Sequence, residues 1–193
     1  MLDVDVWART PFQGRAILGD PAAHLGSHEL KESLEQAEQN FILGTSELEA
    51  IVVRCPDGRR AQPTQTEVTI ERGLEGDRWV EGDAMPGAQL SMMNVDVAAV
   101  MAGGQSITFF GDNLFTRLDL RESALPVGAR LRLGGAEVVV SETPHVPCGR
   151  FRARFGQAAF QAAAKAPRLR GIYLTVLRGG PIAVGDPVVV MDA

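Results

Sequence analysis

Short runs in which apolar and polar residues alternate follow one another from residue 48 to the end of the chain. They are bounded by Gly, Pro or Asp, a pattern typical of β-strands separated by turns. The segment RLRLGGAEVVV predicts a hairpin with Gly134 and Gly135 as its two-residue turn. Many short strands with turn signals favour a barrel or sandwich over a parallel α/β sheet. The predicted strands cover residues 48–55, 66–72, 89–93, 115–120, 129–133, 137–142, 172–177 and 187–191.

A helix is predicted near the N-terminal end, over about residues 28–40. Leu30, Leu34 and Phe41 recur there at helical spacing, and acidic residues stand in the first turn. Gly44 is expected to close this helix. Because the strand pattern begins only beyond it, we expect residues 1–45 to form an N-terminal extension and residues 46–193 to form the barrel domain.

Two further predicted helices interrupt the strands. One covers residues 95–102, with Asn94 as its N-terminal cap and Gly103 directly after its end. The other starts near residue 147 or 149, continues to Lys165 and is ended by Pro167. The predicted fold class is therefore mainly β with α+β character: a β-barrel with flanking helices and a helical N-terminal extension.

Composition and charge exclude several classes of protein. The 193 residues are 45% apolar with a net charge of −5, which fits one folded domain and disfavours a nucleic-acid-binding protein. No apolar run approaches the roughly 18 residues of a membrane-spanning helix. Asp3 and Asp5 stand where a secretion signal carries basic residues, so we expect a cytoplasmic protein with no membrane partner. Cys55 and Cys148 are accordingly expected to be reduced.

The charge is unevenly distributed along the chain. Between Thr143 and Gly185 there are seven basic residues and no acidic one, whereas the remainder carries 12 basic and 24 acidic residues, a net charge of −12. Such a segment is either a solvated basic helix face or part of a pocket for a small, multiply charged anion, since Arg binds phosphate and other oxyanions in bidentate fashion. The basic residues are Arg150, Arg152, Arg154, Lys165, Arg168, Arg170 and Arg178.

Cys148 is the candidate reactive residue. It lies where a predicted strand gives way to a helix, two residues before Arg150, and both the helix N-terminus and the guanidinium favour a thiolate. Cys55, at the end of an apolar strand, fits a buried, inert thiol instead. A Cys-His hydrolase that uses His145 is a weaker alternative, because Pro147 separates the two side chains and no carboxylate is evident to orient the imidazole.

Three segments combine Gly with polar residues at strand ends: GLEGDRW (73–79), FGDNLF (110–115) and TPHVPCGRF (143–151). The first two, taken singly, are ordinary turns. Together with QLSMMN, LPVGARLRLGGAEVVVSET and LRGIYLTVLRGGPIAVGDPVVV they form an ordered set, and on this set the chain resembles the MOSC domain family, named after the C-terminal domain of molybdenum-cofactor sulfurase. The resemblance covers about residues 47–191.

The resemblance implies a MOSC-type β-barrel that binds the molybdenum cofactor, a pterin dithiolene that carries a phosphate. Members of the family either transfer sulfur through a cysteine or reduce N-hydroxylated compounds at molybdenum, so a sulfur transferase or an oxidoreductase is implied. Cys148 matches the cysteine that bears a persulfide or binds molybdenum, and a soft thiolate suits either role. The residues expected to bind the cofactor are Asp77, Arg78, Asp112, Asn113, Arg150 and Arg170.

The chain departs from the family's pattern at three positions. Asp112 stands where Glu is more usual, Trp79 where many members have His, and Gln89 where Arg is frequent. The chain also leaves no room for the pyridoxal-phosphate domain that precedes MOSC in the sulfurase, so we expect no pyridoxal phosphate here. A persulfide would then come from a separate cysteine desulfurase, and a reductase would need an electron-donor protein.

One alternative remains open from the sequence. A small non-catalytic barrel could use the basic segment to bind an anionic ligand or an acidic partner. It differs from the enzymatic hypotheses in one respect, because its ligand affinity would survive the loss of the Cys148 thiol while charge reversal at Arg150 or Arg170 would abolish it.

Overall fold

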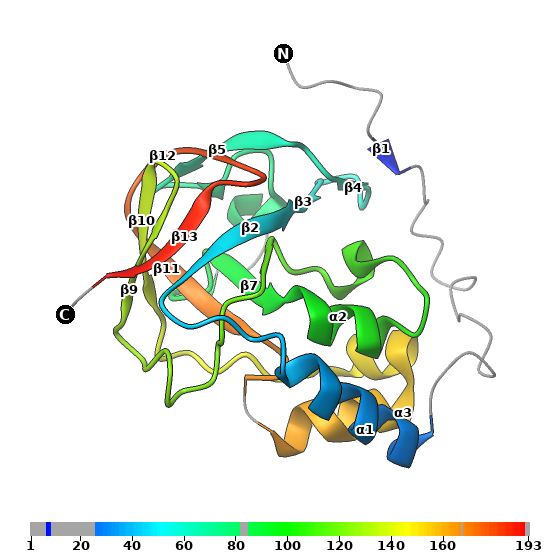
Figure 1. Ribbon diagram of the computed structural model, residues 1–193. Coiled ribbons are helices and arrows are strands. Elements are labelled where there is room, and N and C mark those ends of the chain that lie inside the picture. Colours follow the sequence, from blue (N-terminus) through cyan, green and yellow to red (C-terminus); the bar gives the residue numbers. More distant parts are fainter. Residues whose placement is uncertain (1–6, 9–25, 82–84, 167, 192–193) are drawn as a thin grey trace.

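The core of the molecule is a closed β-barrel of seven strands (Figure 1). The computed structural model describes residues 7–8, 26–81, 85–166 and 168–191. Neighbours around the barrel follow the order β10-β11-β7-β8-β2-β13-β9, and β9 pairs with β10 to close it; β7 and β8 are parallel and the other pairs antiparallel. The mainly β prediction is thus confirmed. The barrel strands are β2 (Thr45–Ile51), β7 (Leu90–Asn94), β8 (Leu114–Thr116), β9 (Arg130–Leu133), β10 (Ala136–Val140), β11 (Ile172–Arg178) and β13 (Pro187–Met191).

Two small sheets flank the barrel in the described part of the chain, in the orders β1-β4-β3 and β12-β5-β6. The predicted single strand over 48–55 is wrong in one detail, because the chain leaves the barrel at Val52, whose N–H donates to the carbonyl of Asn113, and then enters β3. The sequence did not predict β1, β4, β6 or β12, since two to four residues are too few for a period-2 pattern. The bounds are β1 (Trp7–Ala8), β3 (Val53–Arg54), β4 (Arg60–Ala61), β5 (Gln65–Thr69), β6 (Gly73–Leu74) and β12 (Gly180–Ala183).

The barrel interior is filled by the alternate residues of its strands. In β10, Ala136, Val138 and Val140 are buried while the two residues between them are half-buried, as a strand with one inward face requires. The predicted hairpin is confirmed, since β9 and β10 pair around Gly134 and Gly135. Gly134 has a φ of +51°, and a Cβ at Gly135 would lie 2.8 Å from the ring of Pro181, so the tight turn depends on both glycines.

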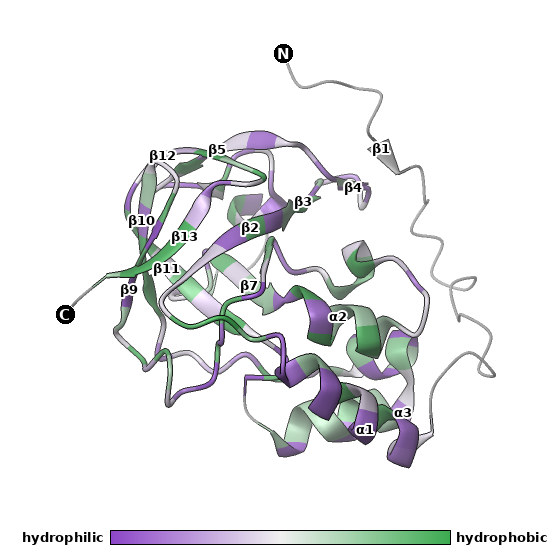
Figure 2. Ribbon diagram, viewed as in Figure 1, coloured by the Kyte–Doolittle hydropathy of each residue, from purple (hydrophilic) through white to green (hydrophobic). Residues whose placement is uncertain are grey.

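Three α-helices of the described residues lie together at one side of the barrel (Figure 1). They are α1 (Ser27–Glu38), α2 (Val95–Ala102) and α3 (Gly149–Lys165). Their apolar faces share a second hydrophobic cluster, to which Leu34, Met101 and Phe155 belong, and α1 is hydrophilic along much of its length (Figure 2). The helix predicted within the N-terminal extension therefore packs against α2 and α3. The domain boundary at residue 45 stays a prediction.

The ends of α1 and α2 test the predicted caps. The Asn94 side chain accepts hydrogen bonds from two backbone N–H groups of the first turn of α2, and Gly103 ends that helix in the left-handed conformation, so both predicted caps are confirmed. The prediction for α1 is wrong at its end. Gln39 caps that helix, and Gly44, with a φ of +76°, lies in the connection to β2.

Helix α3 is confirmed over Gly149–Lys165, but Gly156 interrupts it with a φ of +83° and an extended ψ. The predicted stop at Pro167 lies outside the described residues. The interruption divides α3 into a first part that carries Arg150 and Arg154 and a second part that carries Phe160. The first part lines the pocket that is described below.

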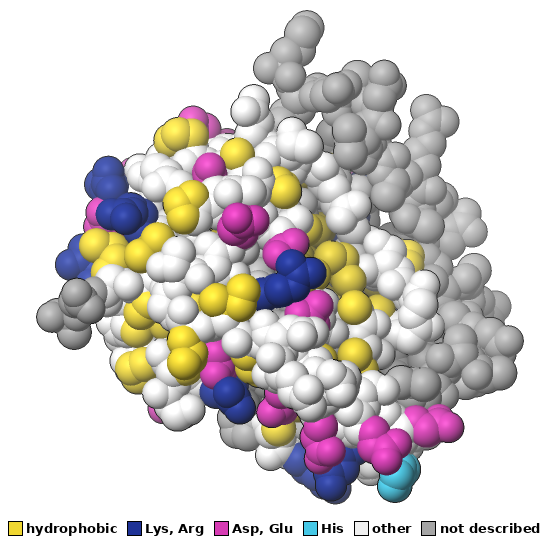
Figure 3. Space-filling model, viewed as in Figure 1, with side chains coloured by type: hydrophobic (Ala, Val, Ile, Leu, Met, Phe, Trp, Pro, Cys, Tyr) yellow, Lys and Arg dark blue, Asp and Glu magenta, His cyan; other side chains and the backbone are white. Residues whose placement is uncertain are grey.

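The exposed side of α1 is acidic. Acidic side chains gather over this helix in the space-filling view (Figure 3), and Glu29, Glu32 and Glu35 are exposed on it. Some of the acidic residues that outnumber the basic ones outside segment 143–185 therefore lie on this surface. No helix in the described part of the chain is long and apolar enough to cross a membrane.

Candidate functional site

A pocket of about 300 Å³ is lined by six arginines and one cysteine. We call it the arginine pocket. Its guanidinium groups come from β3, β4, the 3₁₀ turn 78–81, the first turns of α3 and the segment before β11, and among the described residues no carboxylate lines it. The lining residues are Arg54, Arg60, Arg78, Ser91, Phe109, Phe110, Gly111, His145, Cys148, Arg150, Phe151, Arg154, Arg170 and Tyr173.

Cys148 occupies the N-cap position of α3, and it is exposed. Its carbonyl accepts a hydrogen bond from the N–H of Arg152, while its side chain makes no capping hydrogen bond, so the sulfur is available to the pocket. The predicted position at the start of a helix is confirmed, but the residue does not directly follow a strand, because a loop over residues 141–147 separates it from the end of β10. Cys55 is buried, and burial raises the pKa of its thiol, as expected for the inert cysteine.

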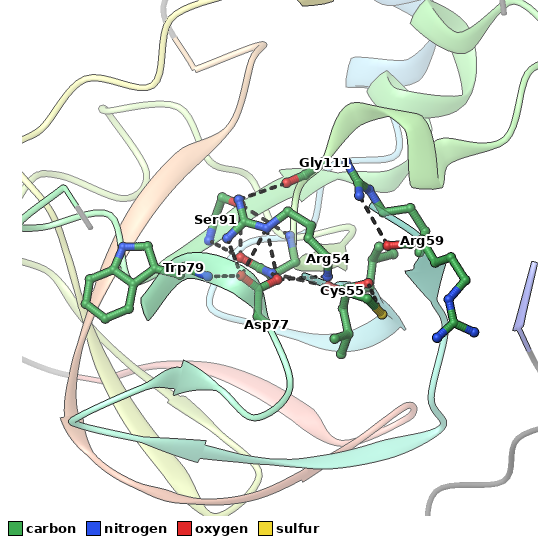
Figure 4. Close-up of polar contacts among 11 residues, drawn as sticks. Arg54, Cys55, Arg59, Asp77, Trp79, Ser91 and Gly111 are labelled. Atoms are coloured by element: carbon green, nitrogen blue, oxygen red, sulfur yellow. Dashed lines mark hydrogen bonds and ion pairs between the residues drawn. The ribbon is translucent and has the colours of Figure 1, made fainter. Parts of the chain in front are cut away.

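Asp77 is buried and does not line the arginine pocket, because its carboxylate is used to hold Arg54 (Figure 4). It accepts hydrogen bonds from Nη2 of Arg54 at 2.7 Å, from Nε at 2.9 Å and from the Arg54 backbone N–H at 2.9 Å. The backbone N–H of Trp79 and the side-chain amide of Asn113 also donate to it, each at 2.9 Å. The side-chain oxygen of Asn113, Oδ1, in turn accepts hydrogen bonds from the backbone N–H and the hydroxyl of Ser91. Asp77 and Asn113 thus form a layer behind the pocket.

A second buried acid holds a second arginine. Asp112 is fully buried and forms an ion pair with Nη1 of Arg170, whose side chain is 8% exposed. Nη2 of Arg170 donates to the carbonyl of Phe110 at 3.2 Å, and the guanidinium lies 5.3 Å from the centre of the Phe151 ring. Asp112, like Asp77, therefore positions a lining arginine and does not itself reach the cavity surface.

Several further guanidinium groups lie close together in the pocket. Burial, with the neighbouring guanidinium groups of Arg78 and Arg154, lowers the pKa of Arg60 to about 10. Its Nε is buried without a hydrogen-bond partner among the described residues. Burial and the charge of Arg150 lower the pKa of Arg154 in the same way. Like charges gathered at this density create a potential that an anion would relieve.

His145 and Tyr173 form an uncharged part of the wall. Their rings stack with centroids 4.1 Å apart. Burial lowers the pKa of His145 to about 3 in spite of the carboxylate of Asp112, and burial raises the pKa of Tyr173, so at neutral pH the imidazole and the phenol are both neutral. Nδ1 of His145 lies 3.5 Å from Oδ1 of Asp112, which supplies the neighbouring carboxylate that was not evident from the sequence.

The buried imidazole predicts a pH dependence of stability. In the unfolded chain His145 has a pKa of roughly 6.5, so below that pH the unfolded state binds a proton that the folded state refuses until about pH 3. Stability contributed by His145 is complete above pH 6.5 and falls as the pH decreases through this window. Between pH 6.5 and 5 wild type should lose about 2 kcal/mol more than His145→Phe, measured by urea unfolding.

A matched control is available for this experiment. The side chain of His28 is 84% exposed on α1, so His28→Gln should keep the wild-type dependence on pH. Equal slopes for wild type and His145→Phe would contradict the buried neutral state of His145.

The residues predicted from the sequence are divided between the pocket surface and the layer behind it. Four of them line the arginine pocket, namely Arg78, Cys148, Arg150 and Arg170. The other three, Asp77, Asp112 and Asn113, are buried behind it, and direct contact of any of the seven with a cofactor stays a prediction. Sequence reasoning missed Arg54 and Arg60, which stand on either side of the turn between β3 and β4 in RCPDGRR. The sequence feature that could have identified them is the presence of basic residues at both ends of a short hairpin.

The basic segment 143–185 contributes to the pocket only in part. Arg150, Arg154 and Arg170 line it, whereas Arg178 pairs with Glu137 at 2.7 Å and Arg168 donates to the carbonyl of Leu120. Three of the seven residues therefore lie at the pocket, and anion binding itself stays a prediction. Arg54, Arg60 and Arg78 come from the acidic part of the chain.

Gln89, a departure from the family's pattern, has a structural role here. Its amide nitrogen donates to the carbonyl of Ile70 at 2.6 Å and its amide oxygen accepts from the N–H of Val176 at 2.7 Å. The side chain therefore joins β11 to the loop after β5. It is 9% exposed and does not line the arginine pocket.

Comparison with known families matches this arrangement to one of them. The family model of the MOSC domain matches residues 89–189, just over half of the chain. The chain belongs to the MOSC domain family. The matched segment runs from the start of β7 to β13, and it includes Asp112, Cys148 and the arginines of α3.

Solved structures show the same fold. YuaD from Bacillus subtilis is similar to this MOSC domain with a TM-score of 0.56 and 16% identity, over 75% of this chain and 94% of that one. YiiM from Escherichia coli has a TM-score of 0.53 and 23% identity, over 76% of this chain and 70% of that one. YiiM from Geobacillus stearothermophilus has a TM-score of 0.52 and 19% identity, over 76% of this chain and 75% of that one. A search of the curated proteins gave no match. At these identities the likeness concerns the fold.

Proposed function

We propose that this MOSC-domain protein binds the molybdenum cofactor in the arginine pocket, with Cys148 as its reactive residue. The observation that carries the proposal is the juxtaposition of six guanidinium groups and one exposed thiol at a helix N-terminus, with no lining carboxylate among the described residues. Guanidinium groups suit a phosphate, and a thiolate suits a dithiolene-bound metal.

The pocket fits the cofactor in three respects. Its volume of about 300 Å³ is at the lower end of the range for small-molecule sites. The unpartnered Nε of Arg60 is a buried donor that an anionic group would satisfy. The described residues contain no group of three His, Cys, Asp or Glu side chains able to hold a metal ion. A metal that arrives with its own sulfur ligands and needs one protein thiolate is compatible with that finding.

The residues of the chain then have separate tasks. When bound, the cofactor supplies two-electron redox chemistry at molybdenum. Arg78 and Arg150 would bind its anionic groups, and Arg54 and Arg170 would add N–H donors at positions fixed by their buried acids. Cys148, at the N-terminus of α3, would supply the sulfur. The positions of Asp77 and Asp112 behind the pocket favour this positioning role over direct binding.

Two modes of action use the same pocket. In the first, Cys148 is a molybdenum ligand and the protein reduces N-hydroxylated compounds with electrons from a donor protein. In the second, Cys148 carries a persulfide received from a separate cysteine desulfurase. Neither mode calls for pyridoxal phosphate in this chain, and both are proposed to operate in the cytoplasm with no nucleic-acid or membrane partner.

Substitution of the two cysteines tests the proposal and separates the modes. In Cys148→Ser, the content of molybdenum or of cyanide-releasable sulfur should fall below about a tenth of the wild-type content, because serine offers a hard oxygen in place of a soft thiolate. Cys55→Ser keeps the pocket thiol and serves as the control. Loss of molybdenum supports the reductase mode, and loss of releasable sulfur supports the carrier mode. Equal losses in both variants would contradict a special role for Cys148.

The non-catalytic alternative makes a different prediction from the same variants. The arginines alone can bind an anion, so a simple binding module would keep its affinity for pyrophosphate in Cys148→Ala and carry neither molybdenum nor releasable sulfur in wild type. That combination of results would replace the enzymatic proposal by the binding module.

A further inference from the structure

Three arginines of the arginine pocket are held by one short stretch of backbone. Consecutive carbonyls of residues 109–111 each accept a hydrogen bond from a different guanidinium group, and Figure 4 shows the one at Gly111. We call residues 109–111 the carbonyl turn. Its three bonds are Arg154 Nη1 to Phe109 at 2.5 Å, Arg170 Nη2 to Phe110 at 3.2 Å and Arg54 Nη1 to Gly111 at 3.3 Å.

The carbonyl turn is the end of the 3₁₀ turn η4 (Ile107–Phe110). Carbonyls at the end of a helical turn have no partner within it, so they are available as acceptors. The arginines that use them come from β3, from α3 and from the segment before β11, between 45 and 60 positions away in the chain. The turn thus gathers guanidinium groups from three distant segments at one place.

The bonds to the carbonyl turn leave the arginines able to bind a ligand. A guanidinium group has five N–H donors, so one bond to a carbonyl leaves others for an anion. The carbonyl oxygens carry partial negative charge, which reduces the repulsion between neighbouring guanidinium groups. In the described part of the chain, Arg78 and Arg150 also line the pocket but do not donate to this turn.

Gly111 sets the direction of the carbonyl turn. It ends η4 in the left-handed conformation, with a φ of +79°. A Cβ at this position would meet no atom within 4 Å, so a side chain there is opposed by the backbone conformation and not by crowding. The next residue, Asp112, is the buried partner of Arg170. A change of φ at Gly111 would therefore turn the carbonyls away from the arginines.

We propose that the carbonyl turn is the positioning element of the arginine pocket. Its carbonyls hold Arg54, Arg154 and Arg170 in the orientation that binds an anion, and Gly111 is the residue on which this orientation depends. Side chains that are already ordered lose less conformational freedom on binding, so the turn raises the affinity for the anion. The identity of that anion as the molybdenum cofactor rests on the proposed function, whereas the positioning does not.

A matched pair of glycine substitutions tests the proposal, with pyrophosphate as the probe. Gly111→Val should weaken pyrophosphate binding about tenfold, because a β-branched residue rarely adopts a positive φ and the turn must change its path. Gly44 is exposed, has a φ of +76° and also has no atom within 4 Å of an added Cβ, but it does not line the pocket. Gly44→Val therefore introduces the same kind of strain and should keep the wild-type affinity.

A milder variant keeps the test decisive if Gly111→Val does not fold. Gly111→Ala adds one methyl group in open space and should weaken pyrophosphate binding about threefold. Far-UV circular dichroism and urea unfolding identify the folded variants, and isothermal titration measures their dissociation constants. Wild-type affinity in the folded Gly111 variants, or an equal loss in the matching Gly44 variants, would overturn the proposal.

A double-mutant cycle separates positioning from a general effect on the fold. Arg154→Gln should weaken pyrophosphate binding by a smaller factor in Gly111→Ala than in wild type, because Arg154 is already less well placed there. Arg78 lines the pocket from the 3₁₀ turn 78–81, so Arg78→Gln should weaken binding by the same factor in both backgrounds. The same factor for Arg154→Gln in both backgrounds would contradict the positioning role.

Failure of this inference can be told apart from failure of the proposed function, because the probe requires no cofactor. Pyrophosphate binding that Gly111→Val weakens, in a protein that takes up no molybdenum, would retain the positioning element and remove the cofactor. Molybdenum uptake by wild type, with undiminished pyrophosphate affinity in the Gly111 variants, would overturn the inference alone. A wild-type protein that does not bind pyrophosphate would overturn the inference together with the anion pocket.

Discussion

Arg150→Glu should weaken the binding of pyrophosphate to the arginine pocket by roughly a hundredfold or more. Loss of one charge-assisted contact costs about 1.5–3 kcal/mol, and the introduced carboxylate adds repulsion of a similar size. Arg150 is exposed on the first turn of α3, so the change leaves the hydrophobic core untouched. Isothermal titration of pyrophosphate into wild type and variant gives the ratio of dissociation constants.

The control for this prediction lies two residues further along the same helix. Arg152 is exposed, lies over the Phe160 ring at 5.7 Å and does not line the arginine pocket. Arg152→Glu changes the net charge of the protein by the same amount, so it separates a specific contact from the general field. An equal loss of affinity in Arg150→Glu and Arg152→Glu would contradict the pocket and favour the solvated basic face considered from the sequence.

Asp112→Asn should destabilise the protein by about 3–5 kcal/mol, the largest effect on stability that we expect from removing one charge. The substitution keeps the shape of the side chain but leaves the buried guanidinium of Arg170 without its counter-charge. Urea unfolding at pH 7 measures the change. Pyrophosphate affinity should fall as well, because Arg170 would no longer be held toward the pocket.

An exposed ion pair provides the comparison. Asp57 pairs with Arg59 on the surface, where both side chains are about half exposed, and solvent screens the interaction. Asp57→Asn should therefore leave the unfolding midpoint almost unchanged. A stability of Asp112→Asn within about 1 kcal/mol of wild type would contradict the account of Asp112 as the residue that fixes Arg170.

Features set by local chemistry could be predicted from the sequence. Asn94 caps α2 because its short side chain reaches the free N–H groups of the first turn, and Gly134–Gly135 makes a turn because the backbone there is crowded. The position of Cys148 at the start of α3 follows from the same kind of signal. Such features depend on residues within a few positions of one another.

The composition of the pocket surface depends on pairing between distant segments and was only partly predicted. Arg54 and Arg60 reach the site because β3 and β4 pair beside the barrel, and neither strand is long enough to show a pattern. A motif places Asp77 in the region of the site but cannot show whether the carboxylate faces a ligand or an arginine. Arg54, which occupies that carboxylate, lies 23 positions away in the chain.

The molybdenum and pterin content of wild-type protein tests the central claim most directly. Protein purified from a host that makes the molybdenum cofactor, or reconstituted with that cofactor, would be measured by elemental analysis and by the fluorescence of the oxidised pterin. The arginine pocket predicts close to one molybdenum and one pterin per chain, both lost on charge reversal at Arg150. Molybdenum and pterin at background level, in a preparation where a known molybdoenzyme is fully loaded, would contradict it.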